Sequence, residues 1–114
     1  MTDILKSLEQ TILQRRDAEP DQRRSADPGA SYVASLRSKG RAKMAEKLGE
    51  EAIETVIAAV QDDKAAMTGE AADLLFHLMV LLADMDLSLD DVVAELARRE
   101  GLSGLDEKAA RGAS

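Results

Sequence analysis

The pattern of apolar and polar positions along the chain is that of α-helices. It predicts one long helix over 41–61 and a second that begins at residue 65 or 68 and ends at 85. In both, apolar residues recur at the three- and four-residue spacing that gathers side chains on one helical face. A turn at 62–63 is too short for the helices to diverge, so we expect them to pack side by side and antiparallel.

Shorter helices and two polar segments complete the predicted chain. Apolar patterns indicate further helices over 3–16, 31–36 and 88–99. The stretch 17–30 contains both prolines and lacks apolar periodicity, so it is predicted to be a flexible loop. Residues 101–114 are small and polar, and we expect them to form a loose tail. We therefore expect a single all-α domain over residues 1–100.

Composition agrees with packed helices and limits the classes of function. The formal net charge of -7 argues against a protein that coats nucleic acid or binds an anionic membrane. There is no cysteine, which excludes disulfides and thiolate metal sites. No signal-peptide pattern is visible, and no run approaches the roughly 18 apolar residues of a membrane span. These features predict a soluble, cytoplasmic protein.

The second long helix carries the most informative polar residues. From 70 to 83 it is apolar almost all round, which predicts burial against a neighbouring helix and another subunit. The exceptions are Glu70, Asp73 and His77, which lie within about 60° of each other on the helical wheel. Ionised carboxylates in such surroundings are costly unless they are paired or bind a metal ion.

The first long helix offers a matching pair of carboxylates. Its polar stripe contains Lys43, Lys47, Glu50, Glu51 and Glu54. Taken alone, this stripe favours a solvated, salt-bridged helix face. Glu51 and Glu54, however, share the i, i+3 spacing of Glu70 and Asp73, so both pairs can converge on one cavity between antiparallel helices. Oxygen ligands without cysteine favour a hard cation, with Mg²⁺ the usual choice beside phosphates.

Other interpretations remain open for single residues. Asp73 can instead form a salt bridge with Lys43 or Lys47 across the helix pair. His77 can be a buried, hydrogen-bonded histidine, or it can orient a neighbouring group or contact the substrate, rather than bind the metal. No nucleophile with an adjacent base is visible, so a covalent intermediate is not expected.

Basic side chains cluster just before the carboxylates. They are Arg37, Lys39, Arg41, Lys43 and Lys47. Such a cluster is either an ordinary solvated patch or, beside a metal site, a set of clamps for phosphates. Ser31 and Gly40 can add a hydroxyl and a close backbone approach at the entry to the same cavity.

Several of these motifs together resemble one family. The runs are SYVASL at 31–36, KG at 39–40, KLGEEAIE at 47–54 and GEAADLLFHL at 69–78. They resemble phosphoribosyl-ATP pyrophosphatase of histidine biosynthesis, which belongs to the all-α NTP pyrophosphatase group with the MazG proteins and dimeric dUTPases. The resemblance extends from the first helix to about Arg99. It implies a MazG-like helical bundle completed by dimerisation, with each site near the subunit interface.

The resemblance also implies an activity and a set of site residues. The reaction is hydrolysis of phosphoribosyl-ATP to phosphoribosyl-AMP and pyrophosphate, the second step of histidine biosynthesis. Glu51, Glu54, Glu70 and Asp73 would bind Mg²⁺, and Glu50 would orient or deprotonate the attacking water. Substrate contacts are implied for Ser31, Tyr32, Lys39, Gly40, Arg41, Lys43, Lys47 and His77. Two alternatives stay open: a general nucleotide pyrophosphatase of the MazG kind, and a non-catalytic helical dimerisation module.

Overall fold

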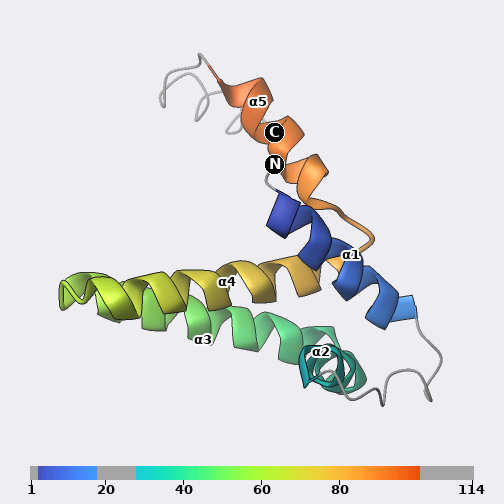
Figure 1. Cartoon of the computed structure of the whole chain (residues 1–114), viewed down its shortest axis with the longest axis horizontal. Helices are drawn as coiled ribbons and strands as arrows, with labels where there is room; N and C mark the ends of the chain where they lie inside the picture. The colour runs from blue at the N-terminus through green and yellow to red at the C-terminus, as the bar shows by residue number, and fades with distance from the viewer. Residues whose placement is uncertain (1–2, 18–27, 101–114) are drawn as a thin grey trace.

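The structure is a computed structural model that describes residues 3–17 and 28–100, with the side chains of 28–31 left out (Figure 1). Its helices are α1 (Asp3–Asp17), α2 (Pro28–Lys39), α3 (Arg41–Val60), α4 (Lys64–Asp84) and α5 (Leu89–Arg99). Over the described residues, the prediction of an all-α fold is therefore confirmed. Most of the loop predicted over 17–30, and the tail predicted over 101–114, fall outside this description.

The antiparallel hairpin of α3 and α4 is the longest feature of the fold and extends away from the other helices (Figure 1). Asp62 occupies the left-handed region in the connecting turn, with φ of 54°. The next residue, Asp63, caps α4 by accepting a hydrogen bond from the Ala66 amide at 3.0 Å. This cap explains why α4 begins at Lys64, earlier than the apolar pattern predicted.

The second helix also begins earlier than its apolar pattern indicated. We expected it to start near Ser31, but α2 begins at Pro28. Proline is favoured at the first position of a helix because it has no amide hydrogen to leave unpaired there. Ser31 consequently lies within α2 instead of capping it.

Gly40 forms the junction between α2 and α3. Its φ of 93° and ψ of 167° lie in a region that only glycine adopts readily. Its amide donates to the carbonyl of Arg37 at 3.1 Å, and its carbonyl accepts from the amide of Met44 at 3.2 Å. These bonds end one helix and start the next without an intervening loop.

The hydrophobic core lies at the base of the hairpin, where α1 and α2 pack against it. The core residues come from all five helices: Ile12, Val33, Leu36, Met44, Met79, Val80, Ala83 and Leu89. Full burial of a large aliphatic side chain contributes roughly 1.5–3 kcal/mol. This cluster is therefore what holds the shorter helices to one end of the hairpin.

The tip of the hairpin is not covered by the described chain. On α3, Ile53 is 63% exposed and Val60 is 81% exposed, and Val56 and Ile57 are also exposed; on α4, Leu75 is exposed. The apolar face predicted for α3 therefore exists, but these side chains are left uncovered by the described residues.

α4 is highly apolar, yet little of it is buried by the described residues. By length and composition alone, α4 is the one helix in the described part of the chain that could cross a membrane, a possibility that we had not expected. Only 17% of its most apolar window is buried within the chain. A helix buried by a partner subunit passes the same test, so this result is weak evidence for a membrane span. The polar side chains of Glu70 and Asp73 within the helix suit a protein interface better than lipid.

Candidate active site

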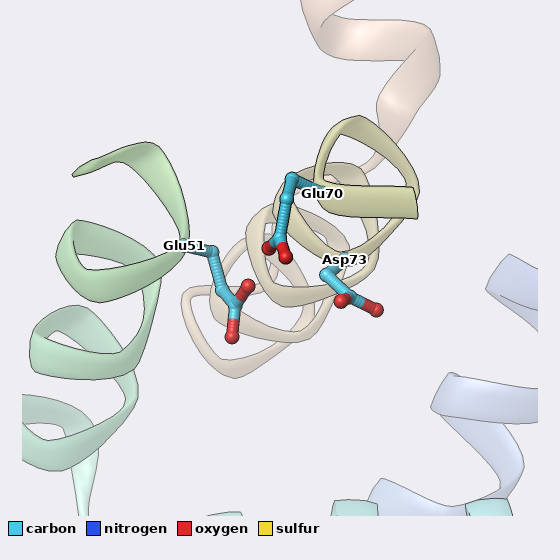
Figure 2. A group of neighbouring side chains, drawn as sticks. All are labelled: Glu51, Glu70 and Asp73. Atoms are coloured by element: carbon cyan, nitrogen blue, oxygen red, sulfur yellow. The ribbon is translucent and has the colours of Figure 1, made fainter. Parts of the chain in front are cut away.

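Three carboxylates meet between the two long helices, midway along the hairpin. Glu51 reaches from α3 toward α4, while Glu70 and Asp73 project from successive turns of α4 (Figure 2). One carboxylate oxygen from each residue lies within 4.8 Å of the others. The helical spacing that suggested a shared cation therefore brings three of the four predicted ligands together.

The buried oxygens in this cluster lack protein partners. Among the described residues, Oε2 of Glu51 and Oε2 of Glu70 are buried without a hydrogen-bond partner. A buried ionised oxygen of this kind is destabilising unless a proton or a cation compensates it. The donor set consists only of carboxylates, which suits a hard divalent cation such as Mg²⁺. These residues therefore fit a metal ion of that class.

The electrostatics of the cluster agree with this description. Hydrogen bonding with Glu54, followed by burial and by the negative charges of Glu54 and Glu51, raises the pKa of Glu70 to about 7. Burial, followed by the charge of Glu54, also raises the pKa of Glu51. Without a cation, the cluster consequently tends to retain a proton near neutral pH. A cation at the same place would allow that proton to leave.

Glu54 and Glu50 lie at the margin of the cluster. Glu54 is exposed on α3 and is close enough to Glu70 to hydrogen-bond with it, although it is outside the three-carboxylate group. Glu50 is also exposed, and one of its oxygens lies 3.2 Å from Nζ of Lys47. Its carboxylate is therefore engaged with a cation of its own helix.

The two lysines of α3 precede the cluster on the same side of the helix. Lys43 pairs with Glu46 at 3.3 Å. Lys47 lies one turn before Glu51, and its hydrogen bond with Glu50 raises the pKa of its ammonium group. The salt bridges observed for both lysines are thus made within α3, whereas one interpretation of the sequence had paired them with Asp73.

The other basic residues lie at the base of the hairpin, away from the carboxylate cluster. Arg41 binds Asp84 through Nε and Oδ2 at 2.8 Å, at the base of the hairpin. Arg37 lies 3.7 Å from the second oxygen of Asp84 and donates to the carbonyl of Arg16 at 2.7 Å. Because each helical residue adds about 1.5 Å, Arg41 lies about 15 Å along α3 from Glu51. Lys39 and Gly40 lie at this same base, where Lys39 is exposed.

Tyr32 and His77 meet beside the cluster. The Tyr32 hydroxyl lies 2.8 Å from Nε2 of His77, and Nδ1 of His77 lies 2.8 Å from the carbonyl of Asp73. His77 is only 6% exposed, whereas Tyr32 is 40% exposed. Both ring nitrogens of His77 are therefore occupied by protein groups. Of the predicted substrate contacts, the Ser31 side chain lies outside the described residues.

One aromatic residue near the site was absent from the sequence-based predictions. The Phe76 ring stacks against Tyr32, with ring centroids 6.0 Å apart, and meets the His77 ring edge-on at 5.4 Å. The sequence feature that could have identified Phe76 was its position directly before His77 in α4. Only the placement of α2 against α4 shows that this ring supports Tyr32.

Comparisons with known proteins agree with these features. The sequence profile of the family described as "Phosphoribosyl-ATP pyrophosphohydrolase" matches residues 5–100. A phosphoribosyl-ATP pyrophosphatase of Rhizorhabdus wittichii is 60% identical over 111 residues, which cover 97% of each chain. One from Erythrobacter litoralis is 63% identical over 100 residues, covering 88% of this chain and 96% of the relative. One from Novosphingobium aromaticivorans is 59% identical over 100 residues, covering 88% and 94%.

Proposed function

The chain belongs to the phosphoribosyl-ATP pyrophosphohydrolase family, and from this membership we propose how its carboxylate cluster acts on phosphoribosyl-ATP. The reaction is hydrolysis to phosphoribosyl-AMP and pyrophosphate within histidine biosynthesis. The chain is accordingly an enzyme of a soluble biosynthetic family, and we place it in the cytoplasm. The observation that supports a catalytic role for the cluster is the meeting of Glu51, Glu70 and Asp73 within 4.8 Å, with buried oxygens that lack partners.

We assign Mg²⁺ to this cluster, with Glu51, Glu70 and Asp73 as ligands and Glu54 as a fourth carboxylate beside them. When bound, Mg²⁺ would neutralise phosphate charge and favour attack by water on the triphosphate. Without the cation, the acidic side chains would repel the substrate. The carboxylates would therefore hold the metal ion, and the positive charge of that ion would allow an anionic substrate to approach.

The chain's own polar residues supply the remaining functions. Lys47 and Lys43 lie one and two turns before Glu51, where their charges can stabilise phosphate oxygens. Glu50 is exposed and lies outside the three-carboxylate group, so we propose that its carboxylate leaves Lys47 to orient the attacking water and accept its proton when substrate phosphates bind that lysine. Lys39, Gly40, Arg41 and Ser31 are proposed to contact more distant parts of the substrate, as the family resemblance implies.

We also propose that the enzyme is a homodimer whose site lies near the interface. Glu51 and Asp73 lie where the covered base of the hairpin gives way to its uncovered tip. The apolar residues of that tip, including Ile53 and Val60, are exposed within one chain. A second copy laid over them would bury this surface and help exclude water from the carboxylates.

An assay of substrate choice tests the proposed reaction. The purified protein is incubated with phosphoribosyl-ATP, dATP, dCTP or dUTP, each with and without Mg²⁺, and released pyrophosphate is measured. We expect Mg²⁺-dependent turnover of phosphoribosyl-ATP with formation of phosphoribosyl-AMP. Turnover of the free nucleotides alone would indicate a general nucleotide pyrophosphatase instead. No turnover of any of them by a folded dimer would indicate a non-catalytic module.

A further inference from the structure

The hydrogen bonds of His77 fix the direction in which Tyr32 donates its proton. The Asp73 carbonyl can only accept, so the 2.8 Å contact requires the proton of the His77 ring to be on Nδ1. In neutral imidazole, Nε2 then carries a lone pair and can only accept. The Tyr32 hydroxyl, 2.8 Å away, must therefore donate to it.

Both ring nitrogens of His77 are held by uncharged groups. The side chain is 6% exposed, and its two hydrogen-bond partners are a backbone carbonyl and a phenolic hydroxyl. The rings of Tyr32 and Phe76 occupy further space around it. The ring is therefore held with Nδ1 toward the backbone of α4 and Nε2 toward Tyr32.

Tyr32 is consequently left with accepting capacity only. Its oxygen retains lone pairs after the proton is directed to His77, and its side chain is 40% exposed. The link from His77 to Asp73 places this oxygen beside the turn of α4 that carries the carboxylate cluster. Ionised phosphate oxygens also only accept, so they are unsuitable partners for it. Hydroxyl groups of ribose and N–H groups of the base are suitable ones.

We propose that His77 is a positioning residue that makes Tyr32 a hydrogen-bond acceptor, and that Tyr32 thereby selects a donor on the ribose or base of the substrate. This inference rests on the proposed function. It assigns the Tyr32 and His77 pair to recognition of the nucleoside part, separate from the groups that handle the triphosphate.

The two products allow a direct test, because phosphoribosyl-AMP retains the ribose and base donors whereas pyrophosphate has neither. The test measures KM, kcat and inhibition by each product for wild type and variants. For Tyr32→Phe, we expect KM and the phosphoribosyl-AMP inhibition constant to rise about 3- to 10-fold, as for loss of one hydrogen bond. We expect kcat and the pyrophosphate inhibition constant to change by less than about twofold.

Two amide variants separate the two nitrogens of His77. The His77→Asn amide can replace Nδ1 but does not reach Tyr32, so it should reproduce the Tyr32→Phe effect. The His77→Gln amide can place an oxygen near the Nε2 position and should restore most of the wild-type KM. The double variant Tyr32→Phe, His77→Asn should be no worse than either single variant, because both remove the same interaction.

Val80→Ala is the control for lost packing in α4, since it truncates a buried core side chain and removes no hydrogen bond. It should lower thermal stability while leaving the phosphoribosyl-AMP inhibition constant within about twofold. Several results would overturn the inference: weaker pyrophosphate inhibition in Tyr32→Phe, multiplicative effects in the double variant, or an equal loss of phosphoribosyl-AMP binding in Val80→Ala. Absence of phosphoribosyl-ATP turnover by the wild type would instead refute the proposed function itself.

Discussion

Glu51 on α3 and Glu70 on α4 each have one buried carboxylate oxygen without a hydrogen-bond partner in the described part of the chain. Their side chains approach each other across the hairpin, with Asp73 beside them (Figure 2). Two carboxylates held in this way favour a proton or a metal ion between them. The folded protein therefore holds an unfavourable arrangement of charge that a proton or a cation would relieve.

The first prediction concerns the pH dependence of stability without metal. The pKa of Glu70 is raised from 4.5 to about 7 in the folded protein, chiefly by hydrogen bonding with Glu54. The folded state holds this proton more tightly than the unfolded state, so its contribution is fully present below about pH 4.5 and is lost as pH rises through about 7. In EDTA, urea unfolding should show that wild type loses more stability between pH 5 and 8 than Glu70→Gln. Glu100→Gln, at an exposed site, should retain the wild-type dependence; an equal slope in Glu70→Gln would contradict the assignment.

The second prediction concerns metal binding by Asp73. Asp73→Asn removes one anionic ligand from an exposed position, so the fold should survive while Mg²⁺ binds more weakly. We expect kcat/KM for phosphoribosyl-ATP to fall by about 100- to 1,000-fold, and the rise in Tm caused by Mg²⁺ to shrink. Asp90→Asn, an equally exposed aspartate of α5, should leave both measurements near wild type. Unchanged Mg²⁺ affinity in Asp73→Asn would support an acidic face without a metal.

The third prediction concerns the exposed tip of the hairpin. A charge introduced by Ile53→Asp should prevent dimerisation, because this side chain is 63% exposed in one chain and belongs to the apolar face of α3. Ile4→Asp is the matched control, since Ile4 is 73% exposed but lies on α1. Sedimentation equilibrium should give a monomer for the first variant and a dimer for the second. Dimers for both would place the interface elsewhere.

The fourth prediction concerns backbone strain at Gly40. Gly40→Ala should lower the free energy of unfolding by about 1–3 kcal/mol, because an alanine there would be held in a conformation that only glycine adopts readily. Crowding is not the cause, since no atom lies within 4 Å of the added Cβ. Gly49→Ala, inside α3 and equally uncrowded, should instead raise stability by roughly 0.5–1 kcal/mol. Urea unfolding of both variants measures the contrast, and equal effects would argue against strain.

The fifth prediction concerns the ion pairs at the base of the hairpin. The Asp84 side chain is only 13% exposed and lies beside both Arg41 and Arg37. Asp84→Ala should therefore lower the free energy of unfolding by about 1–3 kcal/mol, because it removes the mostly buried carboxylate that both guanidinium groups face. Arg98→Ala breaks a pair with Glu95 in which both side chains are about half exposed, and it should cost less than about 1 kcal/mol. A larger loss in Arg98→Ala would reverse this ranking.

Local sequence was sufficient to predict the helices and the candidate ligands. Helical periodicity depends on neighbours three or four positions apart, so the hairpin of α3 and α4 and the pairing of Glu70 with Asp73 could be read directly. The helix starts were less accurate at Pro28 and Lys64, because caps and first-turn prolines lie outside the apolar pattern. The family resemblance supplied the substrate, which spacing alone does not specify.

Tertiary structure alone decided which of these residues meet. Tyr32 and His77 are 45 positions apart, and Arg41 and Asp84 are 43 apart, so neither pair has a local signal. Their contacts depend on the register of α4 against α3 and on where α2 crosses the hairpin base. Many small packing contributions in the core set that register together. The sequence by itself thus determined the helices and the polar positions of α4, while packing decided that Arg41 binds Asp84 and that His77 directs Tyr32.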